Sequence, residues 1–207
     1  MPPLIIRQLH TQPYTHTWQA MQQFTQQRTA NTPDELWVLQ HPPVYTQGLN
    51  GKPQHLLNPN PKIPVIQTDR GGQITYHGPG QLILYFLLDL KRRQLGARAL
   101  VTLIENSLIQ LLASYQIPAQ ARADAPGVYV QNQKIASLGL KIKKQGCYHG
   151  LALNIDMDLT PFQAIHPCGL THIQMTQLKH HAPQAKLPET QQRLLQIVQQ
   201  HLKTPQQ

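Results

Sequence analysis

Residues 70–88 read RGGQITYHGPGQLILYFLL, two short apolar runs separated by a segment rich in glycine and proline. Four glycines within residues 70–80 allow sharp turns and a close approach of the backbone to a ligand, because glycine has no Cβ. Strands are therefore expected over 73–76 and 81–88, with a tight turn between them. Potential hydrogen-bond donors stand beside the glycines at Arg70, Tyr76 and His77. A hairpin between two core strands and a ligand-binding loop both fit this pattern.

Strands and helices are predicted on both sides of this stretch from the spacing of apolar residues. The predicted strands cover residues 4–9, 36–40, 64–68, 127–130, 134–143 and 149–156, and the predicted helices cover 13–28, about 100–112 and about 194–202. A long surface loop is expected over 48–64, and a hairpin turn at 131–133. Because several strands follow one another with helices between the blocks, the sequence predicts an α+β fold with mixed β-sheets flanked by helices.

Length and composition limit the class of protein. The 207 residues suit one domain over residues 1–207, and the 40% of hydrophobic residues suffice for a core. No apolar run approaches the roughly 20 residues that a membrane span requires, so no membrane span is expected. The two cysteines, Cys147 and Cys168, form no CxxC motif and suggest no disulfide framework. A cytoplasmic protein with free thiols is therefore predicted.

The chain is basic, with 18 Lys and Arg against 9 Asp and Glu and a formal charge of +9. Such a charge attracts acidic partners. The basic residues gather only weakly, at Lys91–Arg93 and Lys141–Lys144, and no nucleic-acid-binding motif accompanies them. Nucleic acid is therefore not expected as a partner, whereas an acidic protein fits the charge. Arg92, Arg93 or the Lys141–Lys144 stretch would contribute to its recognition, or would only keep the surface soluble.

Cys168 is the candidate nucleophile, because Pro167 and Gly169 would present its thiol from a loop. Cys147 stands beside a predicted strand and is expected to be a buried structural cysteine. A nucleophilic thiol needs a neighbouring cation or base. The sequence leaves the candidates for this role open, and they are Lys134, His77, His149 and His166. No HExxH motif is present and carboxylates are scarce, so no metal site is predicted.

Three segments occurring in order carry a family resemblance. They are residues 70–81, residues 134–139 together with HGLALN at 149–154, and the Pro-Cys-Gly of 167–169. Together they resemble the lipoyl(octanoyl) transferases, also called octanoyl-[acyl-carrier-protein]:protein N-octanoyltransferases. The resemblance covers nearly the whole chain. It implies the α+β fold that these transferases share with the lipoate-protein ligases and the catalytic domain of biotin-protein ligases.

The resemblance also implies an activity and its residues. Octanoyl would pass from octanoyl-acyl carrier protein to a lysine of lipoyl domains, those of 2-oxoacid dehydrogenase complexes and the glycine cleavage H protein, without a cofactor or a metal. Cys168 matches the nucleophile that carries the acyl group as a thioester, and Lys134 the residue that favours its thiolate. The matching acyl-substrate-binding residues are Arg70, Gly71, Gly72, Gln73, Ile74, Thr75, Tyr76, His77, Ser137, Leu138, Gly139, Gly150, Leu151 and Ala152.

Two questions of mechanism and two of function stay open at this stage. Either Lys134 or a nearby imidazole would accept the proton of the acceptor lysine. The backbone N–H groups that would bind the oxyanion are not determined by sequence. An ATP-dependent lipoate or biotin ligase of the same fold is the nearest alternative, and ATP dependence would distinguish it. A binding protein without catalysis is the second alternative, in which Cys168 would be dispensable.

Overall fold

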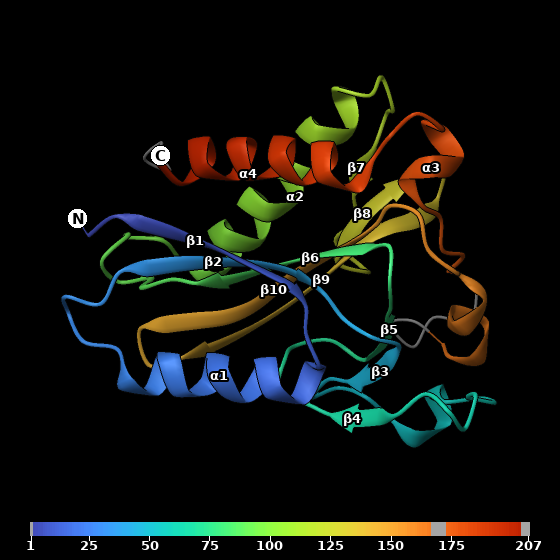
Figure 1. The fold of residues 1–207 in the computed structure, drawn as a ribbon, viewed down its shortest axis with the longest axis horizontal. Helices are drawn as coiled ribbons and strands as arrows, with labels where there is room; N and C mark the ends of the chain where they lie inside the picture. The colour runs from blue at the N-terminus through green and yellow to red at the C-terminus, as the bar shows by residue number, and fades with distance from the viewer. Residues whose placement is uncertain (1, 167–172, 204–207) are drawn as a thin grey trace.

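A seven-stranded mixed sheet forms the centre of the protein, as the computed structural model of residues 2–166 and 173–203 shows (Figure 1). Strands β1 and β2 run parallel, and the other neighbouring strands run antiparallel. In spatial order the strands are β1 (Leu4–Thr11), β2 (Asp34–Gln40), β6 (Gln81–Leu87), β10 (Gly146–Asn154), β9 (Gln133–Lys143), β8 (Gly127–Val130) and β7 (Gln120–Ala121). The α+β class and the mixed sheet predicted from sequence are confirmed.

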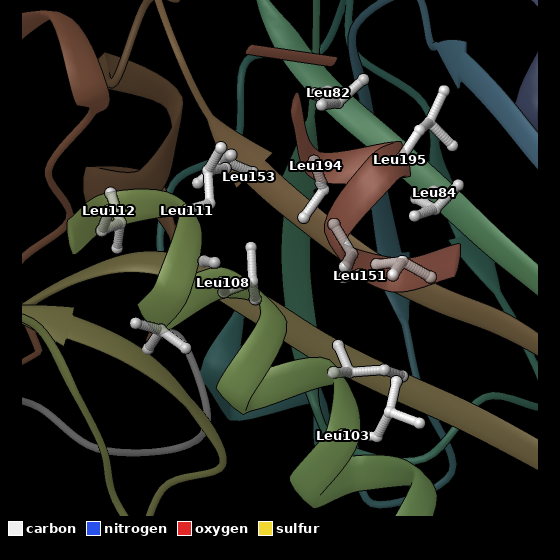
Figure 2. Packing of buried hydrophobic residues seen from close by; sticks show 14 of the residues in the cluster. Leu82, Leu84, Leu103, Leu108, Leu111, Leu112, Leu151, Leu153, Leu194 and Leu195 are labelled. Atoms are coloured by element: carbon white, nitrogen blue, oxygen red, sulfur yellow. The ribbon is translucent and has the colours of Figure 1, made fainter. Parts of the chain in front are cut away.

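Helices cover both faces of this sheet, so the protein has three layers (Figure 1). Helix α1 (Tyr14–Gln27) covers one face, where Met21 packs against Trp37 and Ile83. Helices α2 (Ala97–Ala113) and α4 (Leu187–Lys203) cover the other face. Figure 2 shows their leucines packed on leucines of β6 and β10, and the labelled ones include Leu103, Leu108, Leu194, Leu84 and Leu151. Burial of these side chains supplies most of the driving force for folding.

A second, three-stranded sheet lies beside the N-terminal end of α1, with the order β4-β3-β5 (Figure 1). Its strands are β4 (Val65–Gln67), β3 (Val44–Gln47) and β5 (Ile74–His77). The sequence predicted β4 and β5 but not β3, because the prolines at 42 and 43 indicated the end of a strand. Backbone hydrogen bonds to β4 on one side and β5 on the other stabilise this four-residue strand, and such pairing leaves no local signal.

Short elements complete the described chain. The 3-10 helix η1 (Pro53–His55) lies in the predicted loop, η2 (Thr160–Ala164) follows β10, and α3 (Leu178–His181) precedes α4. The predicted turn at 131–133 is a two-residue hairpin, since Val130 pairs with Gln133. Gln131 and Asn132 both have positive φ, 49° and 67°, as a type I′ turn requires. Within the described ranges, no helix is long and apolar enough to cross a membrane.

Asp34 binds three arginines at the edge of the core. Its carboxylate accepts hydrogen bonds from Arg28 and Arg92 at 2.6 Å and from Arg93 at 2.5 Å, and its side chain is only 3% exposed. The proposed recognition role of Arg92 and Arg93 is therefore corrected, because these side chains are 16% and 10% exposed and bind Asp34. The exposed cations of the two basic stretches are Lys91 in the first and Lys143 and Lys144 in the second.

The Asp34 cluster predicts a strong effect on stability. Asp34→Asn removes the negative charge that three guanidinium groups share in a buried site. We expect the free energy of unfolding to fall by about 3–5 kcal/mol, the usual effect of removing one partner from a buried ion pair. Urea unfolding followed by circular dichroism measures this change.

Asp124→Asn is the matched control, because Asp124 forms an exposed ion pair with Arg122 at 2.6 Å. This variant should unfold at nearly the same urea concentration as the wild type. A loss below about 1 kcal/mol for Asp34→Asn, a value typical of exposed pairs, would contradict the assignment of Asp34 as a buried centre of charge.

Candidate active site

One pocket collects most of the residues that the resemblance assigns to acyl binding. It lies on the face of the large sheet that α1 covers, between strands β9 and β10 and the segment 70–77. Lys134 lines it together with twelve of the fourteen predicted substrate-binding residues. These twelve are Arg70, Gly72, Gln73, Ile74, Thr75, His77, Ser137, Leu138, Gly139, Gly150, Leu151 and Ala152. Segments separated by more than fifty residues in sequence therefore contribute to one cavity.

The other two predicted residues, Gly71 and Tyr76, lie outside the lining of this pocket. The Gly71 N–H donates to the Leu140 carbonyl at 2.9 Å, and this bond attaches the glycine-rich loop to β9. The Tyr76 ring is 3% exposed and packs against Tyr45 and Phe162, with ring centres 5.5 and 5.4 Å apart. Their positions indicate that Gly71 shapes the loop and that Tyr76 stabilises the small sheet.

Small residues make the floor of the pocket. Ser137 of β9 lies opposite Ala152 of β10, and Gly139 lies opposite Gly150. A Cβ on Gly139 would stand 3.1 Å from the Gly71 carbonyl oxygen, and one on Gly150 would stand 2.1 Å from a backbone oxygen of β6. Larger side chains at these positions would displace backbone atoms. The strands can therefore carry a narrow apolar slot between the sheet and the loop.

Arg70 holds the glycine-rich loop in place. Its guanidinium donates to the carbonyl oxygens of Thr46 at 2.5 Å, Gln73 at 2.7 Å and Gly71 at 3.0 Å. It also donates to the Thr46 hydroxyl from Nε at 3.2 Å and from Nη2 at 2.9 Å. The planar guanidinium group of arginine can donate to several acceptors in one plane, and the single ammonium group of lysine cannot reproduce these hydrogen bonds. Arg70 thus lines the pocket and also fixes the backbone that forms one of its walls.

Lys134 is buried, with 1% of its surface exposed. Its side chain passes directly over Gly127, where a Cβ would lie 2.4 Å from Cε. Its ammonium lies 5.5 Å from the centre of the Tyr129 ring, a favourable cation–π distance. Its backbone N–H donates to Gln174 at 2.8 Å, and its carbonyl accepts from Thr176 at 2.9 Å. Lys134 is therefore fixed beside the segment that follows Cys168 in the sequence.

A chain of buried hydrogen bonds connects His77 with the backbone of Lys134. His77 Nδ1 donates to Gln81 Oε1 at 2.7 Å, and Gln81 Nε2 donates to Asn154 Oδ1 at 2.9 Å. Asn154 Nδ2 donates to the Thr176 carbonyl at 2.9 Å, and the Thr176 N–H reaches the Lys134 carbonyl. Burial lowers the pKa of His77 well below its usual value, so this imidazole is neutral. The chain thus sets the positions of both walls of the pocket.

Three aromatic or imidazole rings in the lining were not among the predicted binding residues. They are Tyr14 at the first turn of α1, Tyr85 of β6 and His149 of β10. Tyr14 and Tyr85 lie in apolar patterns that sequence reasoning assigns to the core, so no local signal marks them. His149 was a candidate base from sequence. Its positive φ of 63° is unusual for a residue inside a strand.

The two cysteines differ in what the structure describes. Cys168, the predicted nucleophile, and its neighbours Pro167 and Gly169 lie outside the described residues. Cys147 is fully buried, as predicted, and burial raises the pKa of its thiol to about 12. Its Sγ donates to the Phe86 carbonyl at 3.3 Å, so this thiol is not a nucleophile at neutral pH. His166 does not line the pocket that contains Lys134.

Metal-ligating side chains do not gather in the described part of the chain. No group of three or more His, Cys, Asp or Glu residues there is arranged to hold a metal ion. The site offers a buried ammonium, an apolar slot and backbone N–H groups around a glycine-rich loop. Such an arrangement suits binding of an acyl chain and stabilisation of negative charge beside it.

The fold is that of the lipoate- and biotin-protein ligases. A crystal structure of lipoate-protein ligase A bound with ATP superposes with a TM-score of 0.73 at 12% identity, covering 98% of this chain and 85% of that one. Biotin protein ligase from Aquifex aeolicus superposes with a TM-score of 0.56 at 14% identity, covering 98% and 70%. The biotin/lipoate ligase-like fold predicted from sequence is confirmed.

Sequence comparison defines the family more closely. The profile of the lipoyl protein ligase A/B catalytic domain matches residues 13–199, and the chain belongs to this family. The octanoyltransferase of Hydrogenovibrio crunogenus is 65% identical over 86% of each chain, and that of Chromobacterium violaceum is 54% identical over 98% of this chain and 97% of its own. Within the family the chain is an acyltransferase of the octanoyltransferase type, as its motifs predicted.

Arg70→Lys tests the role of Arg70 in holding the loop. The variant keeps the positive charge but loses the guanidinium N–H groups that donate to Thr46, Gly71 and Gln73. We expect acyl transfer to slow about a hundredfold, because small displacements of positioning groups have effects of this size. Hydrogen exchange at Leu49 and Asn50, whose N–H groups bond to Arg70 and Gly72, should accelerate.

Arg98→Lys is the matched control, since Arg98 is exposed on α2, away from the pocket. Its transfer rate and its hydrogen exchange should equal those of the wild type. Unchanged exchange at Leu49 and Asn50 in Arg70→Lys would show that other contacts hold the loop.

Proposed function

We propose that the protein transfers octanoyl from octanoyl-acyl carrier protein to a specific lysine of lipoyl domains, through a thioester on Cys168. The acceptors would be the lipoyl domains of 2-oxoacid dehydrogenase complexes and the glycine cleavage H protein. The observation that carries this proposal is the single pocket formed by Lys134 and twelve predicted acyl-binding residues. The high identity to octanoyltransferases over most of the chain supports it. We also propose that residues 1–207 act as one domain.

In the first step the Cys168 thiolate attacks the carbonyl carbon of the donor thioester. A tetrahedral oxyanion forms, the donor thiolate leaves with a proton from solvent or a nearby acid, and octanoyl remains on Cys168. Lys134 is the residue proposed to stabilise the thiolate, because its buried ammonium lies beside the segment that follows Cys168. A positive charge close to a thiol favours its ionised form. Exchange of one thioester for another is nearly balanced and needs no nucleotide.

In the second step the acceptor lysine attacks the acyl-cysteine. An amide bond forms, the bond between carbon and Sγ breaks, and Cys168 returns as a thiolate. The attacking amine must first lose a proton, which either Lys134 in its neutral form or an imidazole would take. The His77 imidazole is buried and neutral with both ring nitrogens already hydrogen-bonded, so the proton acceptor is either Lys134 or His149, which lines the same pocket.

The octanoyl tail is proposed to lie along the slot floored by Ser137, Gly139, Gly150 and Ala152. These small residues add little bulk to the floor of the slot, and each methylene of the chain contributes about 0.8 kcal/mol when buried. The loop held by Arg70 would cover the acyl chain on the side opposite the sheet. An acidic carrier protein or lipoyl domain would meet exposed lysines at Lys143 and Lys144.

Intact-mass spectrometry tests this proposal. The protein is mixed with octanoyl-acyl carrier protein in the absence of ATP, and its mass is recorded before and after a lipoyl domain is added. We expect a gain of one octanoyl group, which then moves to the acceptor. Cys168→Ser should show no gain, because a serine hydroxyl is not ionised at neutral pH. Lys134→Met should acylate much more slowly.

Cys147→Ser is the matched control, since the Cys147 thiol is buried with a pKa of about 12. This variant should gain and transfer octanoyl as the wild type does. Labelling of the acceptor only with free octanoate and ATP would instead assign the protein to the ATP-dependent ligases. An octanoyl gain that survives in Cys168→Ser would contradict the assignment of the nucleophile.

A further inference from the structure

Tyr14, Tyr85 and His149, here called the ring wall, line the pocket together with Lys134. His149 lies opposite Leu140 in the pairing of β10 with β9, whereas Lys134 lies six residues from Leu140 along β9. Tyr85 of β6 pairs with Gly150, which puts it two residues beyond the level of Ser137 and beside the small residues of the slot. The ring of Tyr14 is nearly parallel to that of His149, at 13°, with centres 6.5 Å apart. Large rings therefore replace the small residues that floor the rest of the slot.

The length of the slot matches an octanoyl chain. The Lys134 side chain packs on Gly127, which lies opposite Ser137, so its ammonium end is near the level of Ser137. From Ser137 to Leu140, opposite His149, is three residues of strand, or about 10 Å at roughly 3.3 Å per residue. An extended chain advances about 3.5 Å per three bonds, so the seven carbon–carbon bonds of octanoyl span about 8 Å. Its terminal methyl group would end near the ring wall.

The ring wall is held rigidly by hydrogen bonds behind it. His149 Nε2 lies 3.1 Å from Asp69 Oδ1, which also accepts from Trp18 Nε1 at 2.8 Å. Burial opposes ionisation of Asp69, but its four hydrogen-bond donors outweigh this and lower the pKa of the carboxyl. Tyr85 is fixed by the hydrogen bond between its hydroxyl and His41 Nε2 at 2.7 Å. Each ring would lose such a bond, or an ordered packing contact, if it moved to admit a longer chain.

We propose that the ring wall of Tyr14, Tyr85 and His149 sets the length of the acyl chain that this enzyme transfers. This inference rests on the proposed function. Chains shorter than eight carbons leave the slot partly empty and lose apolar contact. Longer chains meet the rings of Tyr85 and His149, which cannot yield without breaking hydrogen bonds, and the buried ring of Tyr14 packed beside them. One methylene more or less in a fitted apolar pocket changes the specificity constant by about tenfold or more. The rigidity of the wall makes this discrimination effective on the long side.

The preference among donors tests the wall. Hexanoyl-, octanoyl-, decanoyl- and dodecanoyl-acyl carrier protein are compared as substrates by kcat/KM. His149→Gly removes one ring and suits the positive φ at this position, because glycine adopts it without strain. We expect the ratio of decanoyl to octanoyl transfer to rise at least tenfold in this variant, from a value well below one in the wild type. If His149 served general structure or catalysis, kcat/KM would instead fall by the same factor for donors of all chain lengths.

His10→Gly is the matched control, because His10 also stands in a strand with a positive φ, 56°, and is exposed on β1. Its chain-length ratios should equal those of the wild type. Ala152→Val provides the second test without altering Asp69 or its partners. The added methyl groups narrow the slot opposite Ser137, at its Lys134 end, so kcat/KM should fall in proportion for all chain lengths and the ratios should stay those of the wild type.

A rise of the decanoyl-to-octanoyl ratio in His149→Gly, with unchanged ratios in Ala152→Val, would support the ring wall as the determinant of length. Transfer of octanoyl by the wild type together with unchanged ratios in both variants would overturn the ring wall and leave the proposed function intact. Failure of the wild type to transfer octanoyl would overturn the proposed function, and this inference with it.

Discussion

The pocket depends on one set of contacts, those of the Arg70 guanidinium with the carbonyl oxygens of its own loop and of β3. Together with the backbone hydrogen bonds of Gly71, Leu49 and Asn50, they fix the path of the glycine-rich segment across β9. Because Gly71 bonds to Leu140 and Gly139 has no side chain, that path lies close enough to the sheet to form a narrow slot. The position of Lys134, the small residues of β9 and β10 and the ring wall matter only because this slot exists.

The order of strands and helices was readable from sequence because most elements bury a regular apolar face. Residues 81–88, 100–112 and 127–130 correspond closely to β6, α2 and β8 in the structure. Strand β3 was not readable, because its stability comes from partners distant in the sequence. The basic residues Arg92 and Arg93 were misjudged for a related reason. Their charge suggested an exposed position on the surface. In the structure they form ion pairs with Asp34, which is distant in sequence, in a largely buried cluster.

The candidate site could be predicted from sequence where functional residues lie close together in short segments. Glycines beside Arg70, and the small residues of β9 and β10, are unusual enough to mark a motif, and the structure brings them together. No sequence motif identifies Tyr14, Tyr85 or Asp69 as site residues. Tyr14 and Tyr85 belong to apolar patterns, and Asp69 stands alone in a loop. Their contribution depends on the contact of α1 with the end of the slot, which is a property of the tertiary structure.

The central claim is that the slot between β9, β10 and the Arg70 loop holds the acyl chain. A crystal structure of the protein after reaction with octanoyl-acyl carrier protein tests it most directly. The account predicts electron density for a thioester on Cys168, with the acyl carbons lying over Ala152 and the terminal methyl group against His149 and Tyr14. Density for the octanoyl group on another residue, or in another cavity of the molecule, would contradict it.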